Sequence, residues 1–280
     1  MKALAILLSP VRNWAALTGA GAIAIRHRHL LSALTAREIK DANVRSIMGS
    51  FWAVGAPLLT MLVYVFAFTL IFRVRMGISD SPADYVGYVL VGLAVWISLQ
   101  ETASRATGAV LNNANLVKQI VFPVEVLPLK TAAAAQLTTL VTLAVAAAAC
   151  AIAGLLTPLS APLFLLALII LFALCVGLSF FLSALAVFMP DVRNLVQLFF
   201  ALGLFLHPIL YPPDAPPPAV AWAFEFSPFS HVLWMFRDAL FYGEITRPHS
   251  WWIAAGFAMA LYILGFRFFR MLKPTFGNAL

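Results

Sequence analysis

Side chains that could do chemistry are sparse in this sequence, and one close pair stands out within its apolar part. Glu101 and Arg105 are four residues apart, a spacing that places both side chains on one face of a helix. The spacing favours an ion pair along that face, and the alternative is a carboxylate that relays protons or binds substrate. Asp191 and Arg193, in MPDVRN, are interpreted as a turn followed by the start of a helix.

No sequence signature of catalysis, nucleotide binding or metal binding accompanies this pair. The chain contains no GxxxxGK[ST] phosphate loop, no GxSxG or HExxH motif and no CxxC pair. His207 and His231 are 24 residues apart without a metal-ligand pattern, so we expect no metal site. The sequence therefore predicts a chain that is not an enzyme and carries no cofactor of its own.

The composition places the chain in a membrane. Hydrophobic residues make up 63% of its 280 residues, charged residues only 10%, and the mean hydropathy is +0.96, whereas a soluble domain carries about a quarter charged residues. The net charge of +7 is interpreted as a signal for topology and for attraction to lipid headgroups, not as nucleic-acid binding. Cys150 and Cys175 lie in apolar stretches and are expected to be small buried side chains.

Six apolar stretches are long enough to cross a bilayer, whose hydrocarbon core of about 30 Å requires roughly 20 helical residues. Backbone polar groups must be paired within each segment in lipid, and no alternation typical of barrel strands occurs, so the spans are predicted to be helices. We expect one all-α transmembrane domain over residues 1–280, with spans at Phe51–Phe72, Tyr85–Thr102, Val126–Leu155, Leu163–Met189, Leu195–Leu210 and Trp251–Phe268.

The positive charges are distributed unevenly over the two sides of this topology. If the N-terminal region is cytoplasmic, 14 Lys and Arg residues lie inside and 4 lie outside, which predicts that both termini are cytoplasmic. The first residues, MKALAILLSPVRNWAAL, superficially resemble a signal peptide. Their apolar core is too short for that function, so we expect an uncleaved N-terminus.

Two connecting segments are expected to lie at the cytoplasmic surface. Residues 24–46 mix leucines with charged side chains, which suits a helix lying in the membrane interface, and a solvated polar helix is the alternative. The cations of interest there are Arg26, Arg28, Arg37 and Lys40. Residues 112–130, NNANLVKQIVFPVEVLPLK, form a compact polar connector with two lysines and two prolines, which indicates a short helix held against another surface.

The longest external segment, residues 211–250, combines proline-rich and aromatic sequence. YPPDAPPP cannot form a regular helix or strand in its interior. AVAWAFEFSPFSHVLWMF is too interrupted to cross the membrane twice, so we expect two short, half-inserted (re-entrant) helices that meet at Ser227-Pro228, with Asp238 ordering the segment. Irregular backbone at membrane depth is tolerated where it is buried in protein or lines a cavity, which favours a conduit.

From Arg37 to its end the sequence resembles the permease subunit of ABC-2 type polysaccharide exporters, the family that moves O-antigen, capsule or teichoic-acid chains. The second of four matching stretches resembles the family's first cytoplasmic connector and is the most specific. The four stretches, in the family's order, are REIKDANVRSIMGSFWAVGAPLLTMLVYVFAFTLIF, SRATGAVLNNANLVKQIVFPVEVLPL, HPILYPPDAPPP and SPFSHVLWMFRDALFYG.

The resemblance implies a homodimer of permeases in the bacterial cytoplasmic (inner) membrane, joined to two copies of a separate ATP-binding subunit that holds ATP and Mg²⁺. The cargo would be a lipid-linked polysaccharide, with O-antigen as the first expectation and capsule or teichoic acid as the alternative. An ABC-2 exporter of small molecules and an intramembrane sugar or acyl transferase are more distant alternatives. The missing phosphate loop agrees with a nucleotide site on another chain.

The resemblance also assigns roles to individual residues. The connector would be the coupling helix that contacts the ATPase, through Asn115, Lys118, Phe122, Pro123 and Glu125. The substrate path at the dimer interface would be lined by aromatic side chains, of which the candidates are Trp52, Tyr64, Phe68, Tyr85 and Tyr88. For these five, a lipid-facing or interfacial aromatic belt is the alternative. An exit gate would be formed by Tyr211, Trp222, Phe224 and Phe226.

Overall fold

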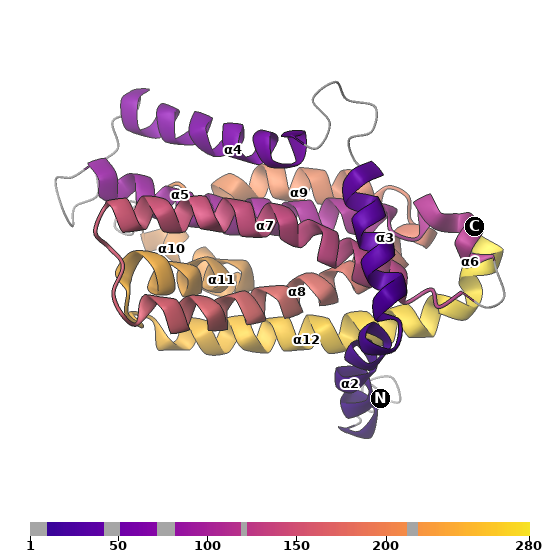
Figure 1. Cartoon of the computed structure of the whole chain (residues 1–280). Helices are drawn as coiled ribbons and strands as arrows, with labels where there is room; N and C mark the ends of the chain where they lie inside the picture. Colours follow the sequence, from indigo (N-terminus) through magenta and orange to yellow (C-terminus); the bar gives the residue numbers. More distant parts are fainter. Residues whose placement is uncertain (1–9, 42–50, 72–81, 119–121, 212–217) are drawn as a thin grey trace.

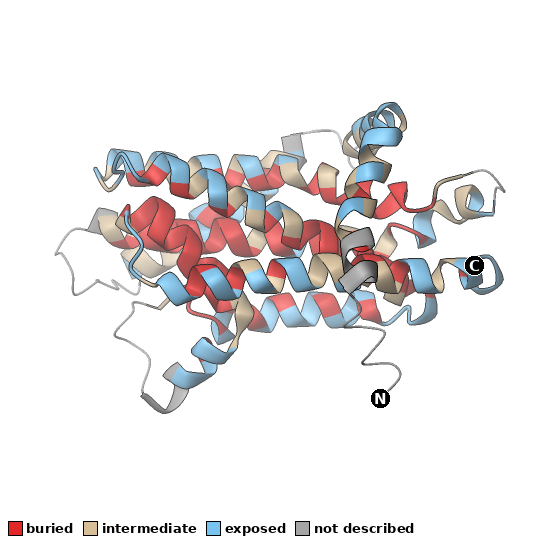
Figure 2. Ribbon diagram, turned by 90° about the horizontal axis from the view of Figure 1, so that it is seen from below, coloured by how far each residue is buried: buried red, intermediate tan, exposed pale blue. Residues whose placement is uncertain are grey.

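The computed structural model of the chain describes residues 10–41, 51–71, 82–118, 122–211 and 218–280. Over these ranges the chain is a bundle whose long helices run side by side along one direction (Figure 1). The described residues contain no β-strand, so the predicted all-α class is confirmed. Buried residues gather along the inner faces of the long helices, and exposed residues cover their outer faces (Figure 2).

Five helices are long and apolar enough to cross a membrane, and each overlaps a predicted span. The first, α4, continues into a π-helical turn. Three others, α5, α8 and α12, begin or end a few residues beyond the predicted bounds, whereas α7 begins at the predicted residue and ends three residues early. Their bounds are α4 Phe51–Phe66 with the turn Ala67–Ile71, α5 Pro82–Gly108, α7 Val126–Ile152, α8 Ser160–Phe188 and α12 Pro248–Leu272.

The helix α9 (Val192–Leu206) differs from the prediction of a full fifth span over Leu195–Leu210. It has 15 residues, or about 22 Å of helix at 1.5 Å per residue, which is shorter than the bilayer core. The helix stops because His207 is extended, with φ −119° and ψ 157°, as expected for a residue that precedes a proline. The described residues therefore contain five full-length candidate spans and two shorter apolar helices, Ala16–Arg26 and Val192–Leu206.

The helix α5 is the centre of the bundle. In its apolar window 78% of residues are buried, compared with 11% for α4. Trp96 on α5 is buried against α9, where its indole Nε1 donates a hydrogen bond to the Phe200 carbonyl oxygen at 3.0 Å. Gly203 permits this approach, since a Cβ there would collide with the indole ring. The packing of α9 on α5 therefore depends on a small residue facing a large one.

The helices α8 and α12 cross at very close range because two glycines face each other. A Cβ on Gly177 would collide with the α12 backbone at Leu261 and Tyr262, and a Cβ on Gly265 would collide with the Gly177 carbonyl oxygen. Close approach at small residues is how helices gain packing contacts in lipid, where burial from water contributes nothing. The crossing fixes α12 along the bundle.

The N-terminal helices lie near one end of the bundle. The helix α2 (Pro10–Arg26) packs on α12, and α3 (Arg28–Asp41) crosses steeply over the long helices near the start of α7 (Figure 1). The helix predicted within residues 24–46 is thus two helices that join at His27, and residues 42–46 lie outside the described ranges. The cross-bundle direction of α3 agrees with a helix lying in a membrane interface.

Short helices complete both ends of the bundle. After α5 the connector contains a 3₁₀ turn (Leu111–Asn113) and α6 (Ala114–Val117), which lie at the same end as the C-terminal turn Lys273–Thr275 and α13 (Phe276–Ala279) (Figure 1). At the opposite end, α10 (Pro218–Phe226) and α11 (Pro228–Arg237) meet at Ser227, as predicted, and a π-helical turn (Asp238–Tyr242) follows. Gly243 ends this turn with φ +67°, which favours glycine.

Candidate functional site

The larger described cavity, of about 800 Å³, lies between α4, α5 and α9. Its wall combines aromatic rings with hydroxyl, amide and charged groups. Glu101 and Arg105 line it as an ion pair, with 2.6 Å between Arg105 Nε and Glu101 Oε1, which confirms the spacing-based prediction. The other lining residues that bear on its chemistry are Trp52, Thr60, Tyr64, Trp96, Gln100, Ser104, Phe200 and Phe205.

Two of the five aromatic residues predicted to line a path reach this cavity. Trp52 and Tyr64, both on α4, are part of its wall. Phe68 lies in the π-helical turn after α4 and is half-buried against the core. Tyr85 and Tyr88 are 1% and 2% exposed, so they belong to the core of the protomer and lie away from the cavity.

The two core tyrosines support the chain that follows α9. The Tyr85 hydroxyl donates a hydrogen bond to the Leu210 carbonyl oxygen at 2.8 Å. The guanidinium of Arg237, which is fully buried, donates to the carbonyl oxygens of Pro208 and Ile209 at 2.5 and 2.9 Å and stacks on the Tyr88 ring at 3.5 Å. The backbone carbonyls of the non-helical residues that follow α9 are thereby paired with side chains of α5 and α11.

Asp238 plays the matching role for the start of α12. Its carboxylate accepts hydrogen bonds from the Thr246 hydroxyl, from the Arg247 backbone N–H at 3.3 Å and from the Trp251 indole N–H at 2.9 Å. These three bonds confirm the prediction that Asp238 orders this segment. The role of Arg237 was not predicted. A lone arginine within an aromatic, apolar stretch was the signal that could have indicated a buried cation with carbonyl partners.

The residues predicted as an exit gate lie in different environments. Trp222 and Phe226 are 62% and 82% exposed on α10, with their ring centroids 6.0 Å apart. Phe224 is buried, and Tyr211 is half-buried at the end of the segment that follows α9. The exposed pair is thus the part of this group that is free to meet another molecule.

The connector also divides into exposed and internal residues. Asn115 and Lys118 are exposed, whereas Phe122 and Pro123 are half-buried, with Phe122 packed on an apolar cluster of the same chain. Glu125 is 6% exposed, and both of its carboxylate oxygens accept hydrogen bonds from Lys273 Nζ at 2.8 Å. The structure therefore places Glu125 in an internal ion pair that joins the connector to the C-terminal turn.

A second cavity, of about 690 Å³, separates the connector from α3. Lys130, at the start of α7, crosses between the two walls: its Nζ lies 3.1 Å from Glu38 Oε2 and 3.5 Å from Asn113 Oδ1. Among the cations predicted for the interfacial helix, Arg37 lines this cavity. Arg26, Arg28 and Lys40 are exposed on the outside of α2 and α3.

Comparison with known proteins identifies the family. Residues 29–241 match the model of the ABC-2 type transporter family. The chain belongs to the ABC-2 type transporter family. Two proteins from Klebsiella pneumoniae, both named O-antigen export system permease protein RfbA, are 27% identical to this ABC-2 chain over 255 and 256 residues, which cover 90% of this chain and 95% of theirs. A protein of the same name from Myxococcus xanthus is 27% identical over 187 residues, 67% of this chain and 70% of its own.

Membership in the ABC-2 family confirms the predicted resemblance and makes the chain a transport subunit of a membrane protein complex. It also implies a partner that binds ATP. The matched range includes the connector, both cavities and the buried network around Arg237.

Proposed function

We propose that this ABC-2 protein is the permease subunit of an ATP-driven exporter that moves lipid-linked polysaccharide of the O-antigen class across the bacterial cytoplasmic membrane. The observation that carries the proposal is the likeness to O-antigen export permeases, which extends over 90% of this chain and 95% of theirs. ATP and Mg²⁺ would be bound by a separate subunit, present in two copies.

The chemistry of the larger cavity supports a sugar polymer as cargo. Sugar rings present apolar C–H faces, which stack on aromatic rings, and polar edges, which hydrogen-bond to charged and amide groups. Trp52 and Tyr64 supply the rings, and Gln100, Glu101 and Arg105 supply the polar groups. Because these contacts are individually weak, successive sugars can exchange along the wall while the chain moves.

Exposed apolar surface on α4 and α9 supports the pairing of two copies of the permease. On α4, Leu62 is 64% exposed, and on α9 Leu202 is 53% exposed. Both helices border the larger cavity. A second copy packed against them would cover the cavity and turn two open walls into one enclosed path between the protomers.

The proposed topology has six crossings with both termini in the cytoplasm. The helix α9 and the turn residues 207–211 would together complete the fifth crossing, with the chain after α9 held by Arg237 and Tyr85. The helices α10 and α11 would then be the re-entrant pair on the external side. The surplus of cations on the opposite side, 14 against 4, supports this orientation.

The exposed part of the connector is the proposed contact with the ATP-binding subunit. Asn115 and Lys118 lie on the surface at the cytoplasmic end, and the apolar ring of Phe122 lies next to the segment that carries them. Movement of this contact would reach the spans by two routes: directly through α7, and through the Glu125–Lys273 pair to α12. Glu125 would thus pass the movement of the ATP-binding subunit on to α12 without contacting that subunit itself.

Deletion of the gene in its native host tests the proposal. We expect loss of the surface polysaccharide and accumulation of its lipid-linked form inside the cytoplasmic membrane, with both effects reversed by the plasmid-borne wild-type gene. Capsule and O-antigen are quantified separately by gel and by glycan analysis. Unchanged export of every surface polysaccharide in the deletion strain, with an altered efflux of small molecules, would contradict the proposal.

A further inference from the structure

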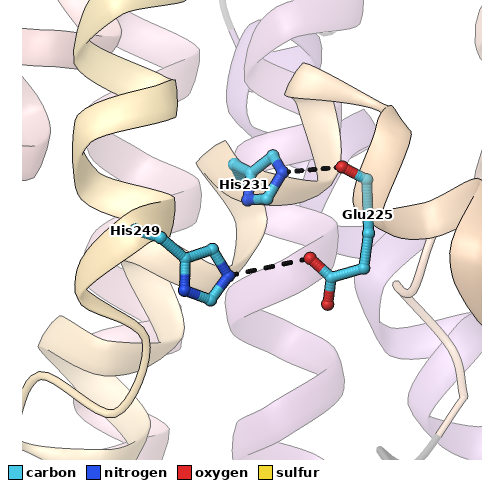
Figure 3. A group of neighbouring side chains, drawn as sticks. All are labelled: Glu225, His231 and His249. Carbon is cyan, nitrogen blue, oxygen red and sulfur yellow. Dashed lines mark hydrogen bonds and ion pairs between the residues drawn. The ribbon is translucent and has the colours of Figure 1, made fainter.

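Three side chains near the junction of α10 and α11 bring together atoms that bind metal ions. Glu225 lies in the last turn of α10, His231 in α11 and His249 in the first turn of α12. One potential ligand atom of each lies within 4.8 Å of the others, and the three side chains point toward one space (Figure 3). They are separated by 6 and 18 residues, a spacing without a sequence motif, which is why no metal site was expected.

His231 is held in one orientation by the protein. It is 1% exposed, and its Nε2–H donates to the backbone carbonyl oxygen of Glu225 at 2.9 Å, since a carbonyl can only accept. Nδ1 is therefore the unprotonated nitrogen, and it accepts from the Ser250 hydroxyl at 3.0 Å. Metal-binding histidines are commonly oriented by a hydrogen bond from the other ring nitrogen to a backbone carbonyl oxygen.

Arg247 occupies only one oxygen of the Glu225 carboxylate. Its Nη1 lies 2.8 Å from Oε1, and its guanidinium stacks on the Trp234 ring at 4.3 Å. The other oxygen, Oε2, faces His249 Nε2 at 3.7 Å. The carboxylate is thus held on one side by a cation that is itself stacked in place, and its free side is directed at an imidazole.

We infer that Glu225, His231 and His249 form a binding site for a divalent transition-metal ion of the zinc class, with His231 Nδ1 as the fixed ligand. Two imidazole nitrogens and one carboxylate oxygen are a ligand set that Zn²⁺ and neighbouring first-row ions bind well. The side chains of Glu225 and His249 are 47% and 56% exposed, so water can complete the coordination.

The geometry requires only a small adjustment. Bonds of about 2.0–2.2 Å to zinc place tetrahedral ligand atoms roughly 3.4 Å apart, compared with up to 4.8 Å here. The exposed side chains of Glu225 and His249 can make this movement. Buried His231 stays in place, and the Ser250 hydroxyl, which now donates to the single lone pair of Nδ1, must rotate away for the metal to bind there. A bound ion would then join α10, α11 and the start of α12, and so fix the bend at Ser227.

A cobalt titration of the full chain tests this inference without any transport assay. The protein is purified in detergent, its affinity tag is removed, and it is stripped with EDTA and dialysed. We expect one Co²⁺ per chain, visible as the absorption of a four- or five-coordinate ion, which Zn²⁺ displaces. His249→Gln and Glu225→Gln are each expected to weaken binding at least tenfold.

The matched control is His29→Gln, which removes an exposed histidine at the other end of the bundle and is expected to leave binding unchanged. Zn²⁺ should also raise the unfolding temperature of the wild type and of His29→Gln but not of the two ligand variants. Absence of saturable cobalt absorption in the wild type would overturn the site. So would cobalt binding by His249→Gln and Glu225→Gln that is as tight as binding by the wild type. Either result leaves the proposed export function untouched, because the assay contains no cargo.

Discussion

The two ends of the bundle are joined by different kinds of contact. At the hairpin end, formed by α10, α11 and the start of α12, the groups that hold the chain after α9 and the start of α12 are enclosed, with Arg237 0% and Asp238 1% exposed. The Glu225–Arg247 pair on the outside of this end is partly exposed. At the connector end, formed by α3, α6, the start of α7 and the C-terminal residues, two ion pairs join the elements: Lys130–Glu38, whose side chains are 9% and 19% exposed, and Lys273–Glu125, which has one accessible partner. The side chain of Lys273 is 37% exposed in its pair with Glu125.

This difference has a consequence for movement. A buried polar network is costly to break, because each group that loses its partner stays out of water. An ion pair with one solvated partner contributes about 0–1 kcal/mol and can be replaced by contacts with water or with another protein. The hairpin end is therefore suited to keep its shape, and the connector end is suited to move when a partner subunit moves.

The largest effect is expected from Arg237→Met at the hairpin end. The change leaves the carbonyl oxygens of Pro208 and Ile209 without donors, and it also removes the cost of burying a charge. Because the first effect is larger, we expect the free energy of unfolding to fall by about 2–4 kcal/mol. Thermal unfolding in detergent, followed by tryptophan fluorescence, measures it. Arg193→Met, at an exposed position on α9, is the matched control and should unfold at the wild-type temperature. Equal stability of the two variants would contradict the claim that the buried network around Arg237 holds the hairpin end in shape.

A smaller loss is expected from Asp238→Asn. An amide keeps one acceptor oxygen, so at least one of the donors from Thr246, Arg247 and Trp251 loses its partner. The expected destabilisation is about 1–2 kcal/mol, measured by the same unfolding assay. A change below the error of the assay would mean that the π-helical turn is held by packing alone.

The smallest change in stability is expected from Glu125→Gln at the connector end. The pair with Lys273 is lost, but Lys273 remains hydrated, so the stability should change by less than about 1 kcal/mol. We nevertheless expect each ATP hydrolysed to move less polysaccharide, because the link from connector to α12 is weakened. Export per ATP at the wild-type level in reconstituted vesicles would argue against transmission through Glu125.

Features set by local pattern could be predicted from the sequence. The helices α7 and α8 follow from apolar runs longer than a bilayer crossing, and the Glu101–Arg105 pair follows from its four-residue spacing. The meeting of α10 and α11 at Ser227 follows from Pro228, the next residue, which is favoured at the first position of a helix. In each case the determining residues lie within a few positions of one another.

Features set by distant packing could not be predicted. Tyr88 was expected in a substrate path, but an aromatic side chain on an apolar helix does not reveal which face of that helix is buried. The residue that covers the Tyr88 ring is Arg237, which lies 149 residues further along the chain. The short length of α9 depends on the hydrogen-bond donors that Arg237 and Tyr85 provide for the carbonyls of the turn residues after it. The neighbouring side chains Glu225, His231 and His249 likewise come from three separate helices.

Reconstitution of the permease with its ATP-binding subunit tests the central claim most directly. Proteoliposomes carry lipid-linked O-antigen polysaccharide in the leaflet that faces the ATPase, and a glycosidase reports on polymer that reaches the other side. The account predicts transfer that requires ATP, Mg²⁺ and both subunits, and that is slowed by Trp52→Ala in the cavity wall. Steady ATP hydrolysis by the assembled complex, with no polymer crossing the membrane, would contradict it.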